Sequence, residues 1–196
     1  MPRTSLRPDI VSAGLRVMLV KGYSAASVRD VVAEAGAPQG SFTNHFASKE
    51  AFSIAVLDAY FDHVMALVGQ ALDDRSISPR ERLERYLDII IEQLDRDGLK
   101  RGCLIGDFSA EATQLNETIR LRLETIFLEW RARFSACIAE GQAQGQIATA
   151  FTPDDLADFL LSSWEGAILR MKVERRPDAL ERFKKIAFAT IFMEPK

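Results

Sequence analysis

The chain has 196 residues, of which 47% are hydrophobic and 27% are charged, and its net charge at neutral pH is −3. This composition suits one or two globular domains, and it argues against a protein whose whole surface is coated with nucleic acid. Two cysteines and two histidines are too few for a disulfide framework or a structural zinc site. We therefore expect free thiols, no metal and no other cofactor.

The charge is unevenly distributed along the chain. Residues 1–50 carry six basic and four acidic side chains, a net charge of +2, whereas the remaining residues have a net charge of −5. A modest basic excess at the N-terminal end is compatible with a local nucleic-acid surface. The sequence shows no secretory signal and no uncharged apolar stretch of about 18 residues, so we expect a cytoplasmic protein that does not enter a membrane.

Helix start and stop signals recur along the whole chain, and they predict an all-α fold. Ser27 with Asp30, and Ser78 with Glu81, have the spacing of capping boxes, and Thr152 precedes a proline at a helix start. The predicted helices cover, approximately, residues 6–21, 27–35, 38–45, 48–70, 79–97, 102–112, 119–144, 153–172 and 178–193. We expect an N-terminal three-helix domain over residues 1–50, joined by helix 48–70 to a C-terminal helical domain over residues 51–196.

The last predicted helix is apolar on two sides. One side carries Leu180, Phe183, Ala187 and Ile191, and the other carries Ile186, Phe188 and Phe192. Both sides require cover, and a second copy of the chain is the simplest source of it. We predict a homodimer, with burial of this helix in its own chain as the alternative.

Residues 36–50 have the pattern of a turn and a DNA-reading helix followed by a capped helix. Gln39 and Asn44 can pair with adenine, and Ser41 and Thr43 can contact a base edge or a phosphate. Gly40 allows the backbone to approach DNA closely. On the other side of this predicted helix, two phenylalanines four residues apart, at positions 42 and 46, are expected to face inward.

These residues, together with neighbouring ones, resemble the DNA-binding domain of the TetR/AcrR family of repressors over about residues 10–57. The resemblance is carried by Ile10-x-x-Ala13-x-x-x-Val17-Met18-x-x-Lys21-Gly22-Tyr23, Ser27-Val28-Arg29-Asp30-Val31, Ala35-Gly36 and Gly40-Ser41-Phe42-x-x-His45-Phe46-x-Ser48-Lys49-Glu50. It implies base contacts from Arg29, Gln39, Gly40 and Ser41. It implies phosphate contacts from Ser27, Thr43, Asn44, His45 and Lys49.

Two positions depart from the family pattern. Position 43 is commonly tyrosine and is threonine here, and position 39 is commonly lysine and is glutamine here. These differences predict a weaker phosphate grip or a different operator. For Arg29 the alternative is a solvated helix face, and for His45 it is simple packing at the end of the reading helix.

The same resemblance implies that residues beyond about 70 form a ligand-binding and dimerisation domain, in which a small-molecule inducer releases a palindromic DNA operator. Cys103 is expected at the start of a short helix beside Lys100 and Arg101, where positive charge favours the thiolate. With Trp164 and Lys172, it is similar to the branch of the family that responds to electrophiles such as N-ethylmaleimide and quinones. The resemblance implies that Cys103 senses an electrophile or oxidant and that Lys172 approaches it.

The alternative is that Cys103, like Cys137 on its apolar helix face, is a small core residue. For a noncovalent inducer, the candidate pocket residues are aromatic, and each can equally be plain core: Phe61, Phe108, Phe127, Trp130, Phe134 and Trp164. A thiol-dependent enzyme and a helical adaptor are the rival functions. An enzyme would need a base near Cys103, and both histidines lie in or near the predicted reading head.

Overall fold

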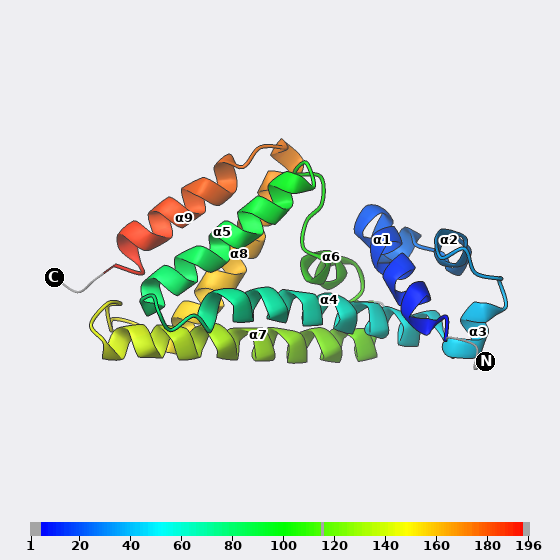
Figure 1. The fold of residues 1–196 in the computed structure, drawn as a ribbon, viewed down its shortest axis with the longest axis horizontal. Coiled ribbons are helices and arrows are strands. Elements are labelled where there is room, and N and C mark those ends of the chain that lie inside the picture. Colours follow the sequence, from blue (N-terminus) through cyan, green and yellow to red (C-terminus); the bar gives the residue numbers. More distant parts are fainter. Residues whose placement is uncertain (1–4, 115, 194–196) are drawn as a thin grey trace. The chain divides into compact units, whose positions relative to one another are not determined.

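The computed structural model describes residues 5–114 and 116–193, and over these residues the chain is helical with no strand, as predicted (Figure 1). The helices are α1 (Arg7–Ala25), α2 (Val28–Glu34), α3 (Ser41–His45), α4 (Lys49–Leu72), α5 (Pro79–Arg96), α6 (Leu104–Glu111), α7 (Glu117–Ala143), α8 (Pro153–Glu174) and α9 (Asp178–Thr190).

The helices group into two compact units. The first unit comprises Met1–His63 and Leu104–Thr125, and the second comprises Val64–Cys103 and Ile126–Lys196. Packing therefore assigns α6 and the beginning of α7 to the same unit as the N-terminal helices. The functional boundary that we place at residue 50 remains a prediction.

The predicted helix starts are formed by the side chains that the sequence indicates. The Ser27 hydroxyl accepts from the Asp30 N–H at 3.1 Å, and the Asp30 carboxylate accepts from the Ser27 N–H at 3.1 Å. Hydrogen bonds from Lys21 and Ser27 hold the pKa of Asp30 well below its ordinary value. Ser78 and Glu81 form the same reciprocal pair at the start of α5. These bonds satisfy backbone donors that a helix leaves open at its first turn.

Two boundaries in the N-terminal region differ from the prediction. The chain breaks at Gly22 (φ 78°), where the first helix was expected to stop, but one more helical turn follows up to Ala25. The reading helix was predicted over residues 38–45 and is observed only over Ser41–His45. The prediction was wrong there because Pro38 lies in the turn before the helix, where its carbonyl accepts from the Ser41 N–H at 2.8 Å.

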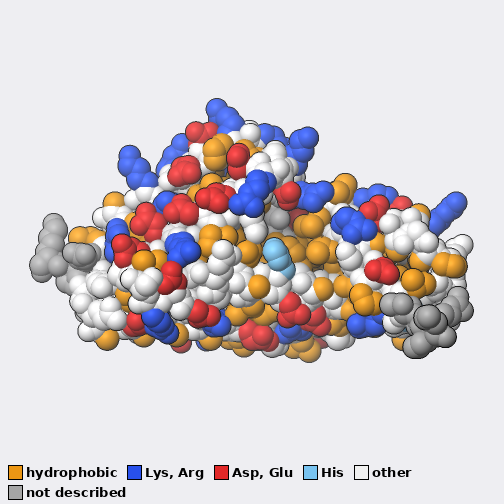
Figure 2. All heavy atoms as spheres, viewed as in Figure 1, with side chains coloured by type: hydrophobic (Ala, Val, Ile, Leu, Met, Phe, Trp, Pro, Cys, Tyr) orange, Lys and Arg blue, Asp and Glu red, His pale blue; other side chains and the backbone are white. Residues whose placement is uncertain are grey.

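By length and composition alone, α4 would be long and apolar enough to cross a membrane. Core helices meet the same criterion. Phe52, Val56 and Leu57 on α4 are at most 1% exposed within the chain, which identifies this part of α4 as a core helix. On the face shown in Figure 2, acidic and basic side chains are interspersed, in agreement with the small net charge.

Among its described residues, the second unit contains one buried cation. Arg82 of α5 is 1% exposed; it donates to the Leu72 carbonyl at 2.9 Å and forms an ion pair with Glu140 at 2.6 Å. A buried charge with these partners fixes the end of α4 and the end of α7 against α5, because losing either partner leaves a polar group unsatisfied in the interior.

Candidate nucleic-acid interface and sensor cysteine

An aromatic cluster attaches α3 to the first unit. Phe42 and Phe46 of this helix region are 4% and 5% exposed, and their ring centroids lie 5.1 Å and 5.0 Å from that of Phe52 on α4. The inward orientation predicted for both phenylalanines is confirmed. A Cβ atom on Gly14 of α1 would lie 2.2 Å from the Phe52 ring, so a larger residue there would displace the cluster.

Opposite this cluster, α3 and the preceding turn present an exposed polar face. Gln39, Thr43 and Asn44 are exposed, and among the described residues neither the Gln39 nor the Asn44 side chain makes a hydrogen bond. A Cβ atom on Gly40 would meet nothing within 4 Å, so the backbone here is open to a ligand. These positions combine unused amide groups with an accessible backbone, which are properties that a base-reading surface needs.

Two residues of α3 that were predicted to contact DNA, Ser41 and His45, are less exposed than Thr43 and Asn44. Ser41 is only 8% exposed, and its N–H is used by the Pro38 carbonyl, so its side chain does not join Gln39 and Asn44 on the surface. His45 is half-buried at the end of α3. The Thr43 hydroxyl donates to the Gly40 carbonyl at 3.0 Å, which leaves its oxygen able to accept.

The second helix offers one cation toward solvent. Arg29 is exposed and forms no ion pair among the described residues. Two basic neighbours on α1 are already paired: Lys21 with Asp30 at 2.8 Å and Arg16 with Glu34 at 2.6 Å. Arg29, by contrast, remains available to an external anion or base.

Ser27 and Lys49, both predicted to contact phosphate, have internal partners in this structure. The Ser27 hydroxyl serves the cap of α2. The Lys49 ammonium donates to the Tyr23 carbonyl at 2.8 Å and lies 4.8 Å from the centre of the Tyr23 ring. Burial lowers the pKa of Lys49, and the nearby Glu111 carboxylate acts in the opposite direction. A phosphate contact by either residue remains a prediction and would compete with these bonds.

The predicted sensor residues Cys103 and Lys172 lie close together in the second unit. Cys103 directly precedes α6 along the chain and is 7% exposed. A Cβ atom on the adjacent Gly102 would lie 3.2 Å from Lys172 Cδ and 3.8 Å from its Nζ. The Lys172 side chain therefore runs alongside the residue before Cys103.

A neighbour of Cys103 that the sequence analysis did not identify is Tyr86 of α5. Burial raises the pKa of Tyr86 well above its ordinary value, with Cys103 and Glu165 acting in the same direction and Trp130 in the opposite one. The phenol is therefore a neutral hydrogen-bonding group near the thiol at physiological pH. Its place on the apolar stripe of α5 gave no sign of this role.

The second thiol, Cys137, is also buried. Cys137 is 4% exposed and its Sγ donates to the Pro79 carbonyl at 3.4 Å. Burial raises the pKa of Cys137 to about 11. The thiolate is the reactive form, so this shift disfavours reaction at Cys137.

The aromatic candidates for a ligand pocket divide between the two units. Phe61 and Phe108 are buried in the first unit, where Phe108 packs on Tyr23 with ring centroids 5.2 Å apart. Phe127, Trp130 and Trp164 belong to the second unit. Phe134, also in that unit, packs edge-on against Tyr86 at 4.9 Å. The six residues therefore do not form one cluster within either unit.

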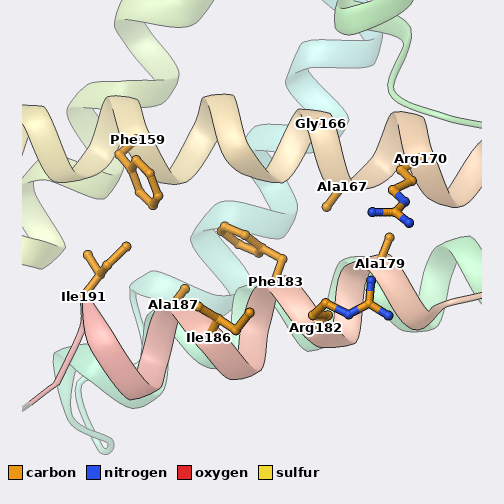
Figure 3. A pocket seen from close by; sticks show the side chains of 10 residues that line it. All are labelled: Phe159, Gly166, Ala167, Arg170, Ala179, Arg182, Phe183, Ile186, Ala187 and Ile191. Atoms are coloured by element: carbon orange, nitrogen blue, oxygen red, sulfur yellow. The ribbon is translucent and has the colours of Figure 1, made fainter.

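An apolar groove of about 300 Å³ runs between α8 and α9 (Figure 3). The side chains of Phe159 and Phe183 point toward the space between the two helices, and Arg170 and Arg182 lie at one end. The rest of the lining consists of small or aliphatic residues: Gly166, Ala167, Ala179, Ile186, Ala187 and Ile191.

Comparisons with known proteins show the family to which this chain belongs. Residues 10–56 match the family model of bacterial regulatory proteins of the tetR family, and residues 79–187 match that of the tetracyclin repressor-like C-terminal domain. The chain belongs to the TetR family of transcriptional regulators. It is 44% identical to the HTH-type transcriptional repressor DhaR of Mycobacterium sp. strain GP1 over 97% of this chain and 94% of that protein.

Two solved structures of TetR-family proteins are similar over nearly the whole chain. The regulatory protein TetR from Rhodobacter sphaeroides has 34% identity and a TM-score of 0.89, covering 93% of this chain and 97% of that one. Escherichia coli NemR in its reduced form has 25% identity and a TM-score of 0.90, covering 98% and 99%. Membership in this family makes the protein a DNA-binding transcriptional repressor and excludes the thiol-dependent enzyme.

For this TetR-family protein, the test uses a duplex selected from a random pool with the wild type. We expect Arg29→Ala and Gln39→Ala each to weaken binding to that duplex by about 1–3 kcal/mol. The loss on random DNA should be smaller, because base contacts carry sequence preference. The measurement is fluorescence anisotropy on both duplexes. Arg96→Ala is the control, since this exposed arginine of the second unit pairs with Glu92. Equal losses on the two duplexes would contradict the assignment of base contacts.

Proposed function

We propose that the protein is a homodimeric one-component repressor that binds a palindromic operator through α3 and is released by a small-molecule inducer, an electrophile or oxidant that acts at Cys103. Such a protein works in the cytoplasm, where the DNA is. The observation that carries the proposal is the exposed face of Gln39, Gly40 and Asn44, held outward by the aromatic cluster beneath α3. A noncovalent inducer is the second candidate for the trigger.

The α8–α9 surface supports the dimer. Leu169 and Val173 of α8 are 62% and 77% exposed, and Ile186 of α9 is 53% exposed beside the apolar groove. Apolar side chains gathered in this way on one surface are typical of an interface between copies. Cover by a second chain would remove them from water.

The second apolar side predicted for the last helix does not need a partner. Phe188 and Phe192 are 6% and 0% exposed within their own chain, and the Arg80 guanidinium lies 5.2 Å from the Phe188 ring. Arg80 also donates to the carbonyls of both phenylalanines. The expectation that a partner covers this side was wrong, because Arg80 of α5 already covers Phe188. Of the three residues on this side, only Ile186 is exposed to solvent.

A dimer suits the proposed operator because two copies of α3 can enter successive major grooves about 34–36 Å apart. Each copy would present the same few side chains to one half-site. The palindrome then follows from the two-fold symmetry of the protein.

Ile186→Glu should raise the dissociation constant of the dimer at least about 100-fold, because a charge would have to leave water at the interface in both copies. Sedimentation velocity over a range of concentrations measures this constant. Leu121→Glu is the control, since Leu121 is an exposed apolar residue of the first unit, 48% exposed. A wild-type protein that stays monomeric at micromolar concentration would refute the dimer.

A reactive inducer is supported by the position of Cys103 near Lys172 and by the raised pKa of the other thiol, Cys137. Addition of Cys103 to a maleimide forms one S–C bond across the C=C bond, and the thiol proton ends on the neighbouring carbon, so no leaving group or oxidant is needed. Lys172, whose side chain runs beside Gly102, is the cation that would assist this attack. The resemblance to NemR, whose structure is described as a reduced form, is in line with this proposal.

With N-ethylmaleimide at pH 7.5, we expect the native protein to be alkylated at Cys103 and to release its duplex, while Cys137 stays unmodified. A thiol whose pKa is about 11 is only roughly 0.03% thiolate at that pH. Peptide mass spectrometry and a gel shift provide the two measurements. Cys137→Ser should behave like the wild type and Cys103→Ser should resist release. Unchanged release of Cys103→Ser would rule out the covalent trigger and leave the noncovalent one.

A further inference from the structure

The DNA-reading helices follow a break in α1. At Gly22 the backbone takes φ 78° and ψ 177°, which interrupts the helix. Only a few residues separate this break from Ser27, the cap of α2. The direction in which α2 and α3 follow α1 therefore depends on how residues 22–24 are held.

Glu111, the last residue of α6, lies directly against this break. Its Oε2 accepts from the Ser24 N–H at 2.9 Å. A Cβ atom on Gly22 would lie 2.3 Å from its Oε1 and 3.0 Å from its Cδ. The carboxylate thus occupies the space that any side chain at position 22 would take, and it binds an N–H that the broken helix leaves open.

The residue between these two contacts is held as well. The Tyr23 carbonyl accepts from Lys49 at the start of α4, and the Tyr23 ring packs on Phe108 of α6. Glu111 is close enough to Lys49 to oppose the lowering of its pKa by burial. Residues 22–24 are therefore held by the beginning of α4, through the Lys49 ammonium, and by the end of α6, through the Glu111 carboxylate.

We propose that Glu111 is a positioning residue for DNA recognition: its carboxylate fixes the Gly22–Ser24 break and thereby the direction of α2 and α3. The inference rests on the proposed function, in which α3 reads the operator.

The test compares Glu111→Ala and Glu111→Gln with the wild type, with Glu124→Gln as control. Glu124 belongs to the same unit, its side chain is 57% exposed, and it pairs with Arg120. Three quantities are measured for each variant: affinity for the duplex selected with the wild type, hydrogen exchange of the Ser24 amide, and the melting temperature.

We expect Glu111→Ala to weaken DNA binding about tenfold, equivalent to roughly 1.4 kcal/mol, and to speed exchange at Ser24. Glu111→Gln should recover part of both effects, since its amide oxygen can still accept from Ser24. The melting temperature should change by less than about 3 °C, because the contact is exposed. The control should match the wild type in all three.

The possible failures are distinguishable. If the wild type binds its duplex and both Glu111 variants bind equally well with unchanged Ser24 exchange, the role of Glu111 is refuted and the proposed function stands. If binding falls only in step with a large drop in melting temperature in both variants, Glu111 is merely structural and the inference is also refuted. If the wild type selects no duplex, the proposed function fails and this inference fails with it.

Discussion

The packing of Phe42, Phe46 and Phe52 is the interaction on which the rest of the reading head depends. With only five residues, α3 is too short to be stable by itself, so its existence and its orientation come from tertiary contacts. The three rings meet at centroid distances of 5.0–5.5 Å, and Gly14 makes room for them on α1. Because Phe42 and Phe46 face inward, the opposite side of α3 with Asn44, and Gln39 in the turn before it, face solvent.

The charged residues of the head are mostly committed to holding its shape. Lys21 and Arg16 pair with carboxylates of α2, and the Lys49 ammonium caps the Tyr23 carbonyl. Arg29 and the amides of Gln39 and Asn44 are exposed and remain available for recognition. A DNA-binding domain of this kind derives specificity from few direct contacts. Its affinity therefore depends on keeping those contacts in the correct position, and the residues that hold the break at Gly22 contribute to this.

Local signals in the sequence predicted the all-helical fold, both capping boxes and the inward phenylalanines, because each depends on residues three or four apart. Features that depend on distant residues were not predictable. Ser24 and Glu111 are 87 positions apart, and nothing in either local pattern links them. Cover of Phe188 by Arg80 was likewise invisible, so an intrachain contact was interpreted as a dimer surface. Pro38 misled because proline suits both a first helical turn and the turn before a helix.

The central claim is that two chains hold one duplex through their α3 helices, and selection of bound duplexes from a random pool, followed by sedimentation of the complex, tests it most directly. The account predicts an enriched palindrome with half-sites about one helical turn apart, bound by chains in multiples of two, with affinity that falls steeply as salt rises. Enrichment of no sequence, or one chain bound to an asymmetric site, would contradict it.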